Sequence, residues 1–110
     1  MRKDDLIRLR HMLDATQEAI SFASGSKRED LDGNRMLVLS LVKDIEIIGE
    51  AATKVSEDCR SEHPEIPWKN IVIMWNRLIH GYFDINLDIV WKTFTEELPS
   101  LMIDLQKALE

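Results

Sequence analysis

The sequence predicts an all-α protein, an up-and-down bundle of four helices in a single domain covering residues 1–110. Apolar residues recur at intervals of three and four along most of the chain, and no segment alternates like a strand. The breaks between these segments are short, which places consecutive helices antiparallel to one another. A chain of 110 residues that is 45% hydrophobic and 31% charged has the composition of one ordinary globular domain.

The first predicted helix opens at Asp4 and Asp5, whose negative charges suit a helix N-terminus. Thr16 and Gln17 interrupt its apolar face. That face consists of Leu6, Leu9, Leu13, Ile20 and Ala23. The stretch ASGSKRED then ends the helix, because Gly25 and its neighbouring serines favour a turn.

A second, long helix is predicted from about Leu31 or Asn34 to about Arg60. Its buried stripe consists of Val38, Leu41, Val42, Ile45, Ile48, Gly49, Ala52 and Val55. Gly49 costs up to ~1 kcal/mol relative to alanine within a helix, and such a small residue would let a neighbouring helix come close. The segment SEHPEIPW is expected to end this helix, since a residue that precedes proline disfavours the helical region.

The third predicted helix has Pro67 at its first position, where the missing N–H does no harm, and ends near Gly81. One side of it carries Ile71, Trp75, Leu78 and Tyr82.

Asp84 or Asn86 is expected to cap the last helix. The apolar stripe of this helix consists of Leu87, Val90, Trp91, Phe94, Leu98, Leu101, Leu105 and Ala108. Pro99 lies inside it, which predicts a kink one turn upstream, where the carbonyl of Thr95 loses its hydrogen-bond donor.

Charge and composition restrict the classes of function. The net charge is −6, whereas proteins that bind nucleic acid non-specifically usually carry an excess of Lys and Arg, so any nucleic-acid site must be small and local. No apolar run approaches the ~20 residues that cross a bilayer. The N-terminal MRKDDLIRLR lacks the apolar stretch of a signal peptide, and a cytoplasmic location is expected. Cys59, the only cysteine, cannot form an internal disulfide.

One segment, WNRLIHGY, concentrates polar and aromatic groups at a helix end. Asn76 and His80 are four residues apart and share a face, and Arg77 lies three residues before His80. A histidine can accept and return a proton near neutral pH, and a guanidinium can hold a phosphate. No paired carboxylates, glycine-rich phosphate loop or Cys/His metal spacing accompany them. The residues alone therefore leave open a surface pair or helix cap as well as a catalytic unit.

The segment from Asp44 to Phe94 resembles the HepT-like branch of the HEPN family, small bacterial helical proteins that act as toxins in toxin–antitoxin pairs. The most specific pieces are IEIIGEA, IPW and NRLIHGYF. The family signature is R-x-x-x-x-H-x-Y. In this sequence His80 and Tyr82 match the motif histidine and tyrosine, Asn76 follows the position of the motif arginine, and Trp75 occupies that position.

The resemblance implies a metal-independent endoribonuclease without a cofactor, the toxin of a type VII-like system (HepT/MntA). His80 would move a proton between the ribose 2′-hydroxyl and the phosphate of an RNA substrate, with Asn76 beside it and Arg77 binding the substrate. The product would be a cyclic phosphate. The resemblance also implies a homodimer with a composite active site, and a nucleotidyltransferase antitoxin (MntA-like) that attaches AMP to Tyr82.

Trp75 argues against full activity. Tryptophan offers one N–H donor and no charge, and loss of a group aimed at transition-state charge costs on the order of 10²–10³ in rate. Arg77 lies about 200° further around the helix and points elsewhere. The residue is either a natural divergence or a change that disarms a toxin, and its indole is expected to pack against the bundle or a dimer partner.

Three hypotheses follow from the sequence. The chain is an attenuated ribonuclease toxin, or a non-catalytic module that binds a nucleotide, RNA or its partner, or a plain dimeric helical protein. We expect RNA cleavage after Trp75→Arg under the first hypothesis alone.

Overall fold

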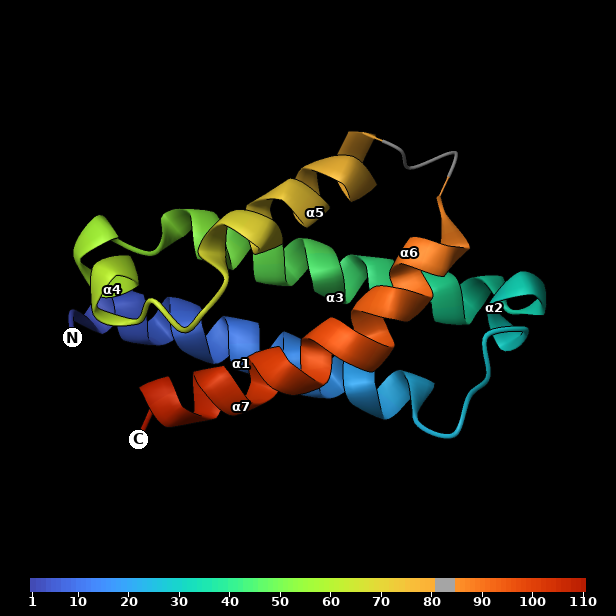
Figure 1. Cartoon of the computed structure of the whole chain (residues 1–110), viewed down its shortest axis with the longest axis horizontal. Helices are drawn as coiled ribbons and strands as arrows, with labels where there is room; N and C mark the ends of the chain where they lie inside the picture. The colour runs from blue at the N-terminus through green and yellow to red at the C-terminus, as the bar shows by residue number, and fades with distance from the viewer. Residues whose placement is uncertain (81–84) are drawn as a thin grey trace.

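The computed structural model describes residues 1–80 and 85–110, without the side chains of residues 79 and 80. In chain order its elements are α1 (Lys3–Ala23), α2 (Asp30–Gly33), α3 (Arg35–Lys54), α4 (Glu57–Glu62), α5 (Trp68–His80), α6 (Leu87–Lys92), the π-helical turn η1 (Thr93–Glu97) and α7 (Leu98–Ala108). The long segments α1, α3, α5 and α6–η1–α7 run in alternating directions (Figure 1). The predicted all-α, up-and-down bundle is thereby confirmed.

Helix α1 packs along α3 and also contacts α7, while α5 rests on α3 (Figure 1). The buried face of α1 is made largely of small and medium side chains: Leu9, Met12, Ala15, Thr16, Ala19 and Ala23. Two details of the predicted face were wrong. Leu6 is exposed, and Thr16 lies in the core, where its hydroxyl donates a 2.7 Å hydrogen bond to the carbonyl oxygen of Met12 and so satisfies itself within the helix.

The predicted end of the second helix near Arg60 was wrong. Helix α3 ends at Lys54, and Val55 has an extended backbone with ψ of 137°. A separate helix, α4, then begins, with Ser56 as its N-cap and the Ser56 hydroxyl accepting a hydrogen bond from the backbone N–H of Cys59. Serine favours N-cap positions because its short side chain satisfies a free N–H of the first turn.

Asp5 of α1 fixes the position of this break. Its carboxylate accepts hydrogen bonds from the backbone N–H of Ser56 at 2.8 Å and from the Ser56 hydroxyl at 2.6 Å. The two residues are far apart in the sequence, so periodicity within one helix carries no sign of the contact.

Two asparagines begin helices as the sequence indicates. The Asn34 side chain accepts a hydrogen bond from the backbone N–H of Leu37 at the start of α3. The Asn86 side chain accepts from the N–H groups of Asp88 and Ile89 at the start of α6. Asp84, the alternative cap, and Gly81, the predicted end of the third helix, lie outside the described residues.

Residues 63–68 position the start of α5. Pro67 lies just before the helix rather than at its first position, and its carbonyl accepts a 3.0 Å hydrogen bond from the N–H of Ile71. Ile66 is buried, and the indole Nε1 of Trp68 donates a 3.0 Å hydrogen bond to the carbonyl oxygen of His63. The IPW segment therefore anchors the helix on one side to the core and on the other to the preceding loop.

The last helix is disturbed one turn before Pro99, as predicted, but by a π-helical turn that contains Thr95. Thr93 and Leu98 are both buried although they are five residues apart. A π turn adds one residue relative to an α-helical turn, and thereby brings both side chains to the core face. The turn shifts the phase of α7 relative to α6.

Candidate functional site

The residues of α5 divide between two sides of the helix. Ile71 and Leu78 are buried, with exposed fractions of 3% and 5%, and Trp75 lies between them on the side that faces α3. Asn70, Ile73, Met74 and Arg77 lie on another side, where they line a cavity. The sequence cluster therefore separates in space into a packing face and a cavity face.

Trp75 packs against the bundle at Gly49. A Cβ atom built on Gly49 would lie closer than 3.0 Å to the Cβ, Cγ and Cδ1 atoms of Trp75, which real Cβ contacts essentially never do. The expectation of a close approach at Gly49 is thereby confirmed. The half-buried Trp75 side chain also shows which way position 75 points, namely toward α3.

The structure does not bring Trp75 and Arg77 together. Both Asn76 and Arg77 are exposed, and Arg77 lines the cavity on the side of α5 away from the Trp75 contact. His80 is the last residue of α5, three positions after Arg77 and hence close to it around the helix. The side chain of His80 and the whole of Tyr82 lie outside the described residues.

The cavity beside Arg77 has a volume of about 420 Å³ and lies between α5 and the α6–η1 segment. Its lining consists of Asn70, Ile73, Met74 and Arg77 from α5 and Ile89, Lys92, Thr93 and Glu97 from the other segment. The buried Thr93 lies at its base: its hydroxyl donates to the Ile89 carbonyl oxygen at 2.8 Å and also lies 3.2 Å from the sulfur of Met74.

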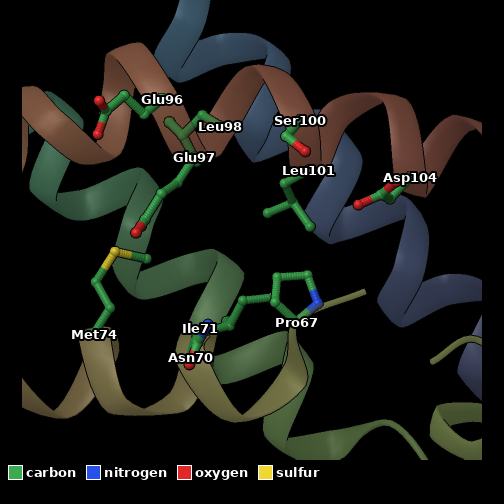
Figure 2. Close-up of a pocket in the computed structure, with 10 residues that line it drawn as sticks. All are labelled: Pro67, Asn70, Ile71, Met74, Glu96, Glu97, Leu98, Ser100, Leu101 and Asp104. Atoms are coloured by element: carbon green, nitrogen blue, oxygen red, sulfur yellow. The ribbon is translucent and has the colours of Figure 1, made fainter. Parts of the chain in front are cut away.

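A second cavity, of about 200 Å³, continues between α5 and α7 (Figure 2). Asn70, Met74 and Glu97 line both cavities and therefore mark the boundary between them. In Figure 2 the side chains of Met74 and Glu97 reach toward each other from opposite helices. Leu101 points toward Pro67 across the second cavity, which gives that cavity an apolar interior.

The two cavities differ in charge. The first is lined by Arg77 and Lys92, with Glu97 at its boundary, while the second is lined by Glu96, Glu97 and Asp104 and, among the described residues, by no cation. Within residues 1–80 and 85–110, as far as their side chains are described, no group of three or more His, Cys, Asp or Glu is placed to hold a metal ion. The first cavity can attract an anion, whereas the second repels one.

Most of the fold and both cavities fall within a region that is shared with a known protein family. The model of the family described as "Ribonuclease HepT-like" matches residues 12–108. The chain belongs to the HepT-like ribonuclease family. The match spans α5 and both cavities, so the candidate site lies within the shared HepT-like domain.

Two relatives show the extent of this similarity. A protein of Caldanaerobacter subterraneus subsp. tengcongensis named "Putative RNase TTE0752" is 34% identical over 102 residues, which cover 93% of this chain and 91% of the relative. A protein of Thermococcus cleftensis named "Probable ribonuclease HepT" is 38% identical over 73 residues, 66% of each chain. No solved structure matches the chain. Among the described residues of this HepT-like chain, no helix is both long and apolar enough to span a membrane.

Lys92 and Glu97 were missed by the sequence reasoning. The α5 side of the cavity could have been predicted, because residues 70, 73, 74 and 77 follow helical spacing and so share one face of the helix. The opposite side depends on how α6–η1 packs and on the π turn, and neither is visible in the hydrophobic pattern.

Proposed function

We propose that this chain is a metal-independent endoribonuclease, the toxin of a toxin–antitoxin pair, attenuated because Trp75 replaces the motif arginine. His80 accepts the proton of the ribose 2′-hydroxyl as its oxygen attacks the phosphorus, the P–O5′ bond breaks, and the leaving 5′-oxygen takes up a proton, so that the products are a cyclic phosphate and a 5′-hydroxyl. Asn76 orients the reacting groups and Arg77 binds the substrate. The observation that supports this most directly is the family match to a ribonuclease across residues 12–108.

The arrangement of α5 is consistent with this chemistry. Arg77 reaches a cavity, and His80 follows it by about 4.5 Å along the helix axis, near enough for the two residues to act on neighbouring parts of one RNA strand. Such a site is local, which reconciles an RNA substrate with a net charge of −6. We propose that the active form is a homodimer in which two copies of α5 build a composite cleft.

The position of Tyr82, two residues after His80, offers a point at which a partner could control the site. We propose that a nucleotidyltransferase antitoxin (MntA-like) attaches AMP to Tyr82. The added group brings phosphate charge to the place that the RNA phosphate occupies and blocks the substrate.

The decisive experiment restores the missing charge. The atoms of Trp75 that press on Gly49 are Cβ, Cγ and Cδ1. Arginine also has carbon atoms at the β, γ and δ positions of its side chain. The first part of an arginine side chain at position 75 can therefore pack against Gly49. Total bacterial RNA is incubated with each variant in the presence of EDTA. We expect Trp75→Arg to cleave RNA on the order of 10²–10³-fold faster than the chain with Trp75.

The controls separate charge from shape. Trp75→Gln removes the indole but adds no charge, and should stay as inactive as the chain with Trp75. Trp75→Arg combined with His80→Ala should lose cleavage again. If Trp75→Arg is folded and dimeric but leaves every RNA intact, the enzymatic function is wrong.

A second candidate function is a non-catalytic module that binds RNA, a nucleotide or its partner. The packing of Trp75 against Gly49 favours it, since this contact commits position 75 to the bundle and leaves no charge there. This function predicts binding that requires His80 and Arg77, and no cleavage even after Trp75→Arg.

A further inference from the structure

The cavity between α5 and α6–η1 places two cations on opposite walls. Arg77 comes from α5 and Lys92 from the end of α6, and both side chains are exposed. None of the ion pairs within the described part of the chain includes either residue. Glu97 lines the same cavity at its boundary with the second one, so the lining still carries more positive than negative charge. Arg77 and Lys92 repel each other, and an anion bound between them removes that repulsion.

We propose that this cavity is a second phosphate subsite, in which Arg77 and Lys92 together bind the backbone phosphate of the nucleotide next to the one that is cleaved. The inference rests on the proposed function for the place of cleavage at His80. Arg77 lies about 4.5 Å from His80 along the helix axis and on nearly the same side, so a strand that leaves His80 enters this cavity first.

The remaining lining fits one nucleotide of an RNA strand. The exposed Asn70 offers an amide that can donate or accept hydrogen bonds, and Ile73 and Ile89 offer apolar surface to a ribose or a base. The Thr93 hydroxyl already donates to the Ile89 carbonyl and therefore adds no donor. Recognition in this cavity is therefore mainly by charge and shape.

Glu97 sets the far limit of the subsite. It lies at the boundary with the second cavity, which also carries Glu96 and Asp104. A phosphate moved one step further along α5 would meet these carboxylates instead of Lys92. On this side of His80 the protein therefore binds a single additional phosphate of the RNA strand. Beyond that phosphate the strand leaves the cavity.

The test measures RNA binding by the full chain, because binding does not require an active nuclease. The probe is a short fluorescein-labelled oligouridylate, and its anisotropy is followed at several salt concentrations. Lys92→Gln should weaken binding by up to about fivefold at low salt, the range of one exposed ion pair. It should also reduce the slope of log K against log salt by about 0.7, the contribution of one single-strand phosphate contact.

Two further variants make the result specific. Lys107→Gln removes a charge that is also exposed, on α7 and outside both cavities, and should leave affinity and slope unchanged. Glu97→Gln should tighten binding, because it removes the carboxylate from the phosphate cavity. Equal affinity and equal slope for Lys92→Gln and Lys107→Gln would overturn the subsite, as would a Glu97→Gln chain that binds no more tightly.

Failure of this inference can be told apart from failure of the proposed function. If Trp75→Arg cleaves no RNA, the proposed function fails, while the binding comparison still decides on the subsite. If Trp75→Arg cleaves, adding Lys92→Gln should raise KM more for an oligonucleotide than for a dinucleoside monophosphate, which has only the scissile phosphate. An equal effect on both substrates would overturn the subsite alone.

Discussion

Gly49 of α3 lies directly against the side chain of Trp75 of α5, and a methyl group at position 49 would come within 3.0 Å of three Trp75 atoms. This contact sets the separation of the two helices. Because Arg77 follows Trp75 on the same rigid helix, the contact also determines where Arg77 stands relative to Lys92 across the cavity. The sequence motif and the IEIIGEA segment are therefore linked by packing.

Gly49→Ala should destabilise the protein although alanine is the better helix former. The close atoms include the Cβ of Trp75, which moves only if α5 moves, and overpacking of this kind costs about 1–3 kcal/mol. The gain in helix propensity offsets up to about 1 kcal/mol of this. We expect urea denaturation to give a net loss of about 1–2 kcal/mol in the free energy of unfolding.

Gly33→Ala is the matched control, since nothing lies within 4 Å of a Cβ built at that helical glycine. It should be neutral or slightly stabilising. Equal stability of the two variants would mean that α5 adjusts to the extra methyl without cost.

Much of the fold could be predicted from local patterns in the sequence. Helical spacing predicts the four long segments, the caps at Asn34 and Asn86 are local hydrogen bonds, and Pro99 indicates the disturbed turn. The break after Lys54 was not predicted: the Ser56 cap is a local signal, but the hydrogen bonds that hold Ser56 come from Asp5 of another helix.

The candidate site was only half predictable for the same physical reason. Arg77 and His80 share one helix, so their relation follows from helical geometry alone. Arg77 and Lys92 meet at one cavity only through tertiary packing. The π turn of η1 adds one residue and so alters the phase of the helix that follows it. A hydrophobic stripe does not encode this phase, since Thr93 is polar and yet buried.

Asp5 should stabilise the fold through Ser56. Hydrogen bonds from the Ser56 hydroxyl, and then from its backbone N–H, hold the pKa of the Asp5 carboxyl below its ordinary value of 3.8. A lowered folded-state pKa gives stability that is present above the unfolded-state value and is lost as the pH falls through the folded-state value. At pH 7 we expect Asp5→Ala to lower the free energy of unfolding by about 1–3 kcal/mol.

Asp4→Ala controls for the charge in the first turn of α1, because Asp4 is exposed and has no hydrogen bond to Ser56. Its effect should stay within about 0.5 kcal/mol at pH 7. The difference between the two variants should shrink as the pH falls well below 4. A constant difference across that range would contradict the role of the ionised carboxylate.

Asp44 should have the opposite dependence on pH. Its side chain is 1% exposed in the α1–α3 interface, and its Oδ2 atom has no hydrogen-bond partner among the described residues. Burial, followed by a hydrogen bond to Glu18 and the negative charge of Glu18, raises the pKa of Asp44 to about 7. Between the unfolded-state value near 3.8 and about 7 the folded state holds a proton that the unfolded state lacks, so stability decreases as the pH rises through this window.

Asp44→Asn removes this penalty, because an amide does not ionise and can donate a hydrogen bond to Glu18. We expect the variant to be more stable than the unmodified chain at pH 8, by about 1–3 kcal/mol, and nearly equal to it at pH 4. Urea denaturation across this range measures both profiles. Glu18→Gln removes the neighbouring charge and so lowers the folded-state pKa of Asp44. The decline should still begin near 3.8, but it should end at a lower pH and be smaller in total. If the free energies of unfolding of the unmodified chain and Asp44→Asn ran parallel with pH, Asp44 would instead ionise with its ordinary pKa despite its burial.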